Sequence, residues 1–121
     1  MNRLIENDVL IYWQEESEVA VIPENVVEIG PECFRNNDNV KKVIFNSRCT
    51  KINSYAFFGC SNLEEVVFPE DSKIKMIQEK AFDRCYKLKE FVYPKGVKII
   101  NELGCNPRRV VLPPNVKTIK E

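Results

Sequence analysis

Ile52-Asn-Ser-Tyr-Ala-Phe57 is the stretch that decides the fold, because related stretches lie before and after it. Ile29-Gly-Pro-Glu-Cys-Phe34 precedes it and Ile77-Gln-Glu-Lys-Ala-Phe82 follows it, and the isoleucines that open the three copies are almost evenly spaced along the chain. A repeat of this period indicates stacked coils, each too small to bury its own apolar face. Such coils share one interior with their neighbours and present extended surfaces on which partners can bind.

A short apolar run follows each copy of the repeat and predicts a strand. In the run Leu63-Glu-Glu-Val-Val-Phe68, Val66 and Phe68 are expected to point into the coil, and Glu65 and Val67 to point outward. A second apolar pair in each repeat predicts a short extended segment on the opposite wall. The Ala-Phe pair predicts a brief helical turn that places its phenylalanine in the interior.

The chain of 121 residues is about the length of one domain. Residues 1–20 are expected to form an N-terminal capping hairpin, with strands at Val9–Trp13 and Glu18–Ile22 joined by a turn at Gln14–Ser17. Trp13 would cover the first coil. Residues 21–121 are expected to form the solenoid, with coils at about 21–46, 47–70, 71–95 and 96–115.

Charge and hydropathy bear on function and location. Lys and Arg number 18, and so do Asp and Glu, so the formal net charge is zero and no bulk basic excess favours nucleic acid. No stretch approaches the ~20 apolar residues of a membrane span. Residues 1–8 contain acidic residues where an export signal needs an uninterrupted apolar run. We therefore expect a cytoplasmic protein, or alternatively a secreted or cell-surface protein whose export signal has been removed.

The repeats resemble those of the BspA-type leucine-rich repeat family. The resemblance is carried by Val26-Val-Glu-Ile29, by Ala56-Phe-Phe-Gly-Cys-Ser-Asn-Leu63 and by Ala81-Phe-Asp-Arg-Cys-Tyr-Lys-Leu88, and it covers about residues 19–119. It implies a leucine-rich-repeat solenoid, α/β or mainly β, of about four right-handed coils with a parallel sheet on one face. Many members of the family are surface or secreted proteins that bind host or matrix molecules.

The five cysteines are expected to be free and structural. Cys60, Cys85 and Cys105 occupy the same place in successive repeats, Asn37 takes that place in the first, and the column is predicted to meet backbone atoms inside the solenoid. The chain has no histidine to lower the pKa of a thiol, and no cysteine pair has C-x-x-C spacing. We therefore expect no catalytic cysteine, no disulfide, no metal and no cofactor.

The outward strand positions are the candidate site for a protein partner. They form a charged column and an aliphatic column. The aliphatic column either forms the floor of a groove for a partner or results from the β-propensity of branched residues alone. A register slip of one residue would turn both columns inward. The predicted partner-binding residues are Lys42, Ile44, Glu65, Val67, Glu90, Val92, Arg109 and Val111.

These features predict a non-enzymatic protein-binding module, in its sharpest form a small intracellular inhibitor or adaptor. The alternative is a fragment of a secreted or cell-surface adhesin-type repeat protein, and the third hypothesis is an enzyme. Glu64 and Glu65 would be its paired carboxylates, but strand neighbours point to opposite faces. Residues 116–121 begin a further coil that is not completed, which suggests a homodimer formed through the C-terminal coil.

Overall fold

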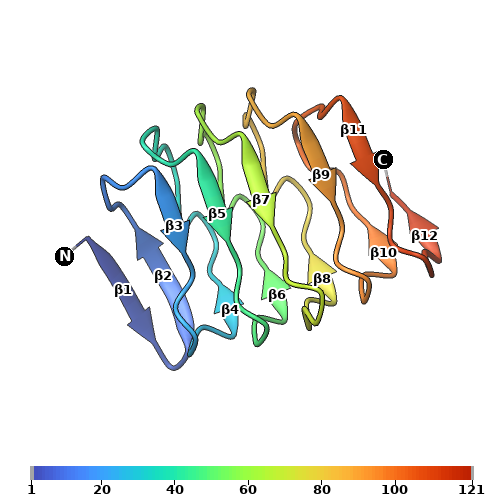
Figure 1. Cartoon of the computed structure of the whole chain (residues 1–121), viewed down its shortest axis with the longest axis horizontal. Helices are drawn as coiled ribbons and strands as arrows, with labels where there is room; N and C mark the ends of the chain where they lie inside the picture. Colours follow the sequence, from blue (N-terminus) through green and yellow to red (C-terminus); the bar gives the residue numbers. More distant parts are fainter. Residues whose placement is uncertain (1, 121) are drawn as a thin grey trace.

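The computed structural model describes residues 2–120, in which coils of extended chain follow one another along a single axis (Figure 1). None of these residues is helical, so the fold is a mainly β solenoid. Within this range there is accordingly no helix that could cross a membrane. The two ends of the chain lie at opposite ends of the stack (Figure 1). Each coil has three walls, which we call the front wall, the back wall and the third wall.

The front wall is built from short parallel strands whose register agrees with the sequence prediction. Lys42 pairs with Glu65 and Ile44 pairs with Val67, so the outward columns run straight from coil to coil. The middle residue of each strand points inward, and Val43, Val66 and Phe91 are buried there. Within residues 2–120 the front-wall strands are β3 (Val19–Val21), β5 (Lys42–Ile44), β7 (Glu65–Val67), β9 (Glu90–Val92) and β11 (Arg109–Val111).

The back wall is formed by the second apolar pair of each repeat. Ile29, Ile52 and Ile77 are buried there and lie in one register across neighbouring coils. This wall is itself a parallel arrangement, so sheets line two faces of the solenoid. Its strands within the described range are β2 (Val9–Trp13), β4 (Glu28–Ile29), β6 (Lys51–Ile52), β8 (Met76–Ile77), β10 (Ile99–Ile100) and β12 (Thr118–Ile119).

An N-terminal hairpin caps the stack, but its strands differ from the prediction. β1 (Arg3–Glu6) pairs antiparallel with β2. Asn7 (φ 51°) and Asp8 (φ 64°) join them, as a type I′ turn requires. The predicted partner strand at Glu18–Ile22 instead supplies β3, the first front-wall strand. The coils therefore number about five rather than four. Met1 and Glu121, the outer limits of the predicted cap and solenoid, lie outside the described residues.

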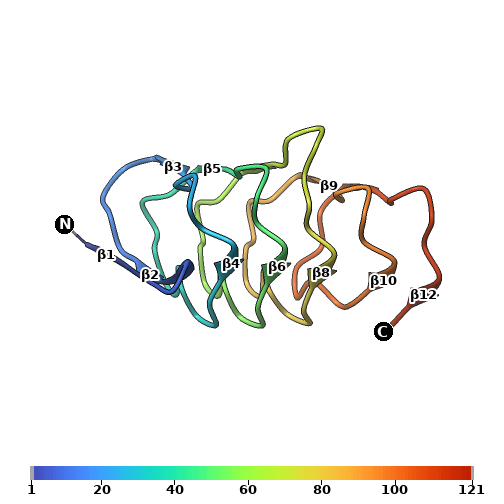
Figure 2. The ribbon, with the colours of Figure 1, turned by 90° about the horizontal axis from the view of Figure 1, so that it is seen from below.

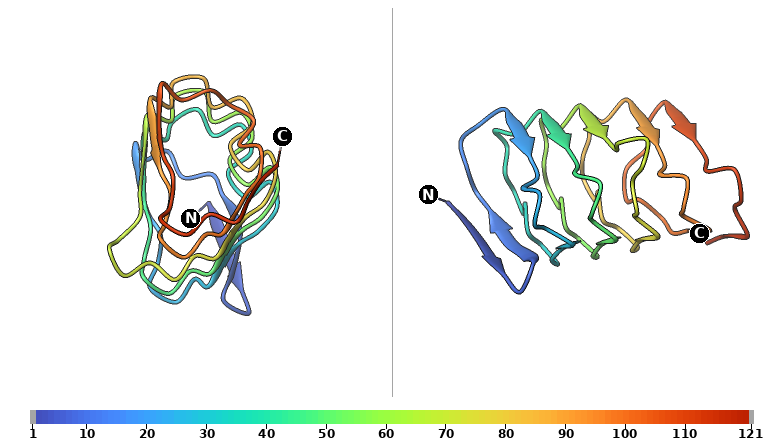
Figure 3. Two further views of the ribbon diagram at one scale, coloured as in Figure 1. Left: turned by 90° about the vertical axis from the view of Figure 1, so that its right-hand side faces the viewer. Right: turned by 60° about the horizontal axis from the view of Figure 1, so that its bottom comes forward.

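The interior is filled by a column of aromatic rings behind the third wall. The rings of Phe34 and Phe57 lie 4.6 Å apart between centroids, and those of Phe57 and Phe82 lie 4.8 Å apart and are nearly parallel. Trp13 stacks on Phe34 at 5.6 Å and closes the column, as predicted. All three phenylalanines are fully buried. The view along the axis shows the coils superposed around this shared interior (Figure 3).

The third wall is a ladder of turns rather than the helical turns that we predicted. Phe57 N donates to Ala81 O at 2.8 Å, and each neighbouring coil repeats this bond. Tyr55 (φ 60°) and Gly59 (φ 71°) adopt left-handed conformations on either side of Phe57, and these prevent a helix from continuing. The coils are thus joined by backbone hydrogen bonds along this wall as well.

Both sheet walls are interrupted at one junction, between the coil that starts at β7 and the coil that starts at β9. Within residues 2–120, β7 does not pair with β9 and β8 does not pair with β10. The third wall continues across the junction, where Phe82 N donates to Leu103 O at 3.0 Å. The two coils differ in length, since the first spans positions 65 to 90 and the second only positions 90 to 109. Coils of unequal length cannot match on all three walls, and the extra chain projects as the loop between β7 and β8 (Figure 2).

This interruption predicts a local difference in amide hydrogen exchange. Phe45 N donates to Val67 O at 2.9 Å and Tyr93 N donates to Val111 O at 3.0 Å. The equivalent Phe68 N has no backbone acceptor within residues 2–120. We expect the Phe68 amide to exchange at least about tenfold faster than those of Phe45 and Tyr93, because exchange requires an unbonded N–H. Equal protection of all three amides, measured by NMR, would show that the ladder is continuous.

Candidate functional site

The front wall presents the two predicted columns to solvent. Val43 and Val66 are buried between them, so the register is the one predicted and not the slipped one. In the aliphatic column Val21 is 58% exposed and Val92 is 44% exposed. Ile44, Val67 and Val111 are half-buried in the same column. The chain therefore keeps a stripe of branched aliphatic residues on an accessible surface.

The charged column is organised into two ion pairs on either side of the interrupted junction. Lys42 Nζ lies 3.6 Å from Glu65 Oε1, and Arg109 Nη1 donates to Glu90 Oε2 at 2.7 Å. Each is a surface pair and stabilises the fold by ~1 kcal/mol or less. Glu65 and Glu90 hold equivalent strand positions on the two sides of the junction, and like charges in neighbouring strand positions disfavour pairing. The column thus carries positive and negative groups in a fixed order along the front wall.

A groove of about 560 Å³ opens between β7 and β9. We call it the front-wall groove. Four of the predicted partner-binding residues line it, namely Glu65, Val67, Glu90 and Val92. Of the other four, Lys42 and Ile44 lie on β5, one strand before the groove, and Arg109 and Val111 lie on β11, one strand after it. The predicted residues thus form one surface, with the groove at its centre.

Sequence reasoning missed part of the groove lining. Phe68 and Tyr93 line it together with the two prolines that follow them, Pro69 and Pro94. Phe68 was expected in the interior and is instead half-buried, with one side on the core and one on the groove. The shortening of the repeat after β9 was the available signal, because it marks the junction at which the strands separate.

An ion pair connects the two rims of the groove at one end. Lys95 donates to Glu70, and both side chains line the groove. This hydrogen bond and the charge of Lys95 lower the pKa of the Glu70 carboxyl. Both side chains are exposed, so a partner can replace either of them with its own charged group.

Cys60 and Cys85 of the predicted cysteine column meet backbone atoms inside the solenoid, whereas Cys105 is half-buried and forms no such bond within residues 2–120. Cys60 Sγ donates to Phe34 O at 3.1 Å, and Cys85 Sγ donates to Phe57 O at 3.2 Å. Asn37 Nδ2 makes the equivalent contact to Trp13 O at 3.4 Å in the first coil. Each side chain therefore ties its coil to the coil before it, and all five thiols are free.

Burial makes these thiols poor nucleophiles. It raises the pKa of Cys49 to about 11 and that of Cys60 to about 12, and it raises the pKa values of Cys33 and Cys85 further still. The half-buried Cys105 is shifted in the same direction by partial burial, which raises its pKa to about 11. A thiol becomes a useful nucleophile or metal ligand only as the thiolate. Residues 2–120 hold no group of three or more His, Cys, Asp or Glu side chains placed to bind a metal.

Residues 11–121 match the BspA type leucine rich repeat region, in 6 copies, and the chain belongs to this family. The predicted family is confirmed, and so is the predicted solenoid fold. No curated protein matches the sequence.

Solved structures share the fold. A leucine-rich repeat protein of T. pallidum superposes with a TM-score of 0.78 at 21% identity, over 98% of this chain and 60% of that one. A leucine-rich repeat protein of Bacteroides capillosus superposes with a TM-score of 0.69 at 25% identity, over 96% of this chain and 91% of that one. A leucine-rich cell surface protein of Faecalibacterium prausnitzii superposes with a TM-score of 0.65 at 21% identity, over 98% of this chain and 42% of that one. The present chain therefore spans less than two thirds of the first and third of these proteins.

Proposed function

We propose that this chain is a non-enzymatic protein-binding module that recognises its partner through the front wall, centred on the front-wall groove. The observation that carries this proposal is the coincidence of three features in one place. The groove is hollowed, its floor carries the aliphatic side chains of Val67 and Val92, and its rim carries charges in a fixed order. Apolar centres with charged rims are typical of protein interfaces, where the charges set register and specificity.

The setting that we propose is a secreted or cell-surface repeat protein. The likeness to a cell surface protein of F. prausnitzii supports this alternative over the intracellular inhibitor or adaptor. Buried thiols are compatible with an oxidising compartment, because a disulfide requires two cysteines that can approach each other and react. The raised thiol pKa values and the absence of histidine from the sequence support a non-enzymatic role.

The double variant Val67→Asp, Val92→Asp tests the proposal. Both side chains lie on the floor of the front-wall groove, so the partner would have to bury two unpaired carboxylates. Each such group costs about 1–3 kcal/mol, so affinity should fall by at least about 30-fold. The measurement is affinity capture with the immobilised protein from extracts of the source cells and of their hosts, read by quantitative mass spectrometry.

The matched control is the double variant Leu4→Asp, Ile11→Asp on the N-terminal hairpin. These two side chains are 39% and 38% exposed, and the substitution introduces the same charge away from the front-wall groove. A specific partner is retained by the wild type and by the hairpin variant and is lost with the front-wall variant. Identical captured proteins for all three would contradict the proposal, provided that circular dichroism shows all three to be folded.

The homodimer through the last coil stays a prediction, and one observation supports it. Val110 is 43% exposed, Leu112 is 47% exposed and Ile119 is 59% exposed. The residues one coil earlier in the same columns, Phe91 and Tyr93 among them, are buried. These three side chains are the ones that a second copy would cover in such a dimer.

A further inference from the structure

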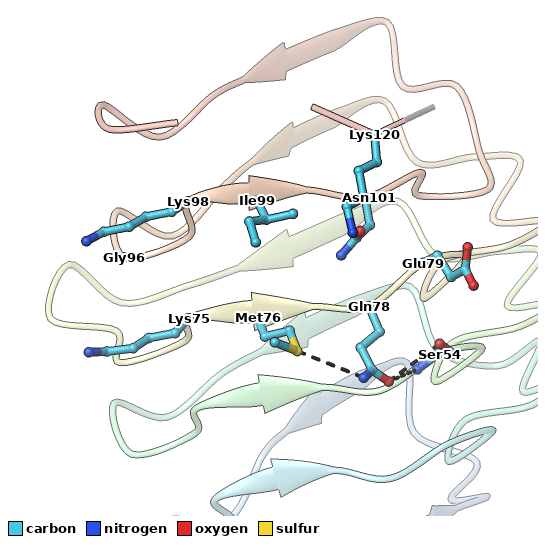
Figure 4. Close-up of a pocket in the computed structure, with 10 residues that line it drawn as sticks. All are labelled: Ser54, Lys75, Met76, Gln78, Glu79, Gly96, Lys98, Ile99, Asn101 and Lys120. Atoms are coloured by element: carbon cyan, nitrogen blue, oxygen red, sulfur yellow. Dashed lines mark hydrogen bonds between the residues drawn. The ribbon is translucent and has the colours of Figure 1, made fainter. Parts of the chain in front are cut away.

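A second hollow opens at the same junction on the opposite face of the solenoid. It lies between β8 and β10, has a volume of about 570 Å³ and is shown in Figure 4. We call it the back-wall cleft. Its size is within the range of ligand-binding sites in proteins. No residue of the front-wall groove lines it, so the two hollows are separate sites.

The floor of the cleft is apolar, whereas the strands next to it carry polar residues in the same column. Met76 and Ile99 occupy one outward column and are 45% and 43% exposed. The same column holds Glu28 and Lys51 in the preceding coils and Thr118 in the following one. Met76 and Ile99 therefore lie together at the cleft, with the polar residues Lys51 and Thr118 next to them in the column.

Positive charge lies at both ends of this apolar floor. Lys75 and Lys98 precede β8 and β10 and extend side by side in the same direction, whereas Lys120 lies at the opposite end beside Asn101 (Figure 4). Within residues 2–120 none of these three lysines forms an ion pair. Glu79 is the single carboxylate in the lining of the cleft. The cleft therefore has a net positive charge that the described part of the chain leaves without counter-charge.

Backbone groups along the cleft also lack partners. Lys75 N donates to Thr50 O at 2.9 Å, and Lys117 N donates to Lys98 O at 2.8 Å. The equivalent bond from Lys98 N to Lys75 O does not form within residues 2–120. One side chain spans the gap, since Asn101 Nδ2 donates to Ile77 O at 2.8 Å. Unpaired strand edges of this kind are the groups with which an extended peptide forms main-chain hydrogen bonds.

We propose that the back-wall cleft binds an extended acidic peptide segment. One acidic side chain would lie between Lys75 and Lys98, and a second would reach Lys120. An aliphatic side chain between them would lie on Met76 and Ile99. Alternate residues of an extended peptide face the same way, so the aliphatic residue lies two positions from each acidic residue and the acidic residues are spaced four apart. They are then about 13 Å apart, against about 10 Å between Lys98 and Asn101, and the long lysine side chains span the difference. The apolar floor and the strand edges favour a peptide over a small anion.

A fluorescein-labelled peptide with the core Glu-Ser-Val-Ser-Glu, flanked by Gly-Ser, tests this proposal by fluorescence polarisation. We expect the wild type to bind it at least about tenfold more tightly than the same peptide with Gln in place of both Glu. The double variant Lys75→Gln, Lys98→Gln should weaken binding of the Glu peptide at least about tenfold. The variant Ile99→Ser should weaken it about threefold to tenfold, because the aliphatic residue loses its contact.

The matched control removes two positive charges from outside the cleft, in the double variant Lys41→Gln, Lys87→Gln, and should bind within twofold of the wild type. An equal loss in the two double variants would overturn the proposal in favour of attraction by net charge. Equal binding of the Glu and Gln peptides would overturn it as well. A third result would overturn the proposal in favour of a small-anion site. In that case Lys75→Gln, Lys98→Gln would weaken binding of the Glu peptide, Ile99→Ser would leave it unchanged, and millimolar inorganic phosphate would displace the peptide.

Discussion

Replacing Phe57 by Ala should lower the free energy of unfolding by about 3–5 kcal/mol, the usual cost of removing a buried phenylalanine. Its ring lies between those of Phe34 and Phe82, at 4.6 Å and 4.8 Å, and meets the edge of Phe45 at 6.3 Å. Each coil depends on its neighbours for an apolar wall, so the cavity would weaken both junctions at once. A small domain has a total stability of about 5–15 kcal/mol. The measurement is the midpoint of urea unfolding followed by circular dichroism.

The matched control is Phe58→Ala, which removes the same side chain one position along the chain. Phe58 is half-buried on the outside of the third wall, where the guanidinium groups of Arg35 and Arg84 lie 5.6 Å and 5.3 Å from its ring. We expect this variant to lose about 1 kcal/mol, because cation–π contacts at exposed sites are weak. Equal losses for the two variants would contradict the shared aromatic interior.

Stability should fall steeply above pH 8.5 because the buried thiols keep their protons in the folded state. Unfolded cysteines ionise near pH 8.5, whereas burial raises the pKa of Cys49 to about 11 and that of Cys60 to about 12. The unfolded state therefore binds fewer protons as the pH rises, and the free energy of unfolding decreases with pH. The stability that the buried, protonated thiols contribute is fully present below about pH 8.5. It is lost as the pH rises from about 8.5 towards the pKa values of the folded state. For Cys33, Cys49, Cys60 and Cys85 together we expect a loss of about 5 kcal/mol between pH 8 and pH 9.5, measured by urea unfolding in a reducing buffer.

The variant Cys49→Val separates this effect from other alkaline changes. Valine already occupies the equivalent place in other coils, at Val26 and Val97, where it is buried. We expect the variant to have near wild-type stability at pH 8. Between pH 8 and pH 9.5 its free energy of unfolding should fall by about 1 kcal/mol less than that of the wild type, since one titrating thiol has been removed. A variant as pH-sensitive as the wild type would show that buried thiols do not cause the decline.

The periodic parts of the fold could be predicted from the sequence because each repeat carries the same local signal. The column of Phe34, Phe57 and Phe82 and the strand register around Val66 follow from residue spacing alone. The same spacing placed the eight candidate residues on one outward face. Their role in binding is a matter for experiment, because spacing reports where a side chain points and not what it meets.

The non-periodic parts could not be predicted in the same way. The cap was misassigned because Arg3–Glu6 is too short to show a clear alternation, and its turn at Asn7-Asp8 was overlooked. The third wall was expected to be helical because left-handed conformations at residues such as Tyr55 leave little trace in composition. The two hollows arise from unequal coil lengths, an effect that exists only between coils.

The measurement that tests the account most directly is a nuclear Overhauser spectrum of the protein. We predict ring-to-ring contacts along the whole aromatic column, including Phe82 to Phe91, whose centroids are 5.0 Å apart. We also predict interstrand backbone contacts of a parallel ladder between β5 and β7 and between β9 and β11, with no such ladder between β7 and β9. A continuous ladder through all the front-wall strands, or rings that do not contact one another, would contradict the solenoid with two hollows on which both proposed binding sites depend.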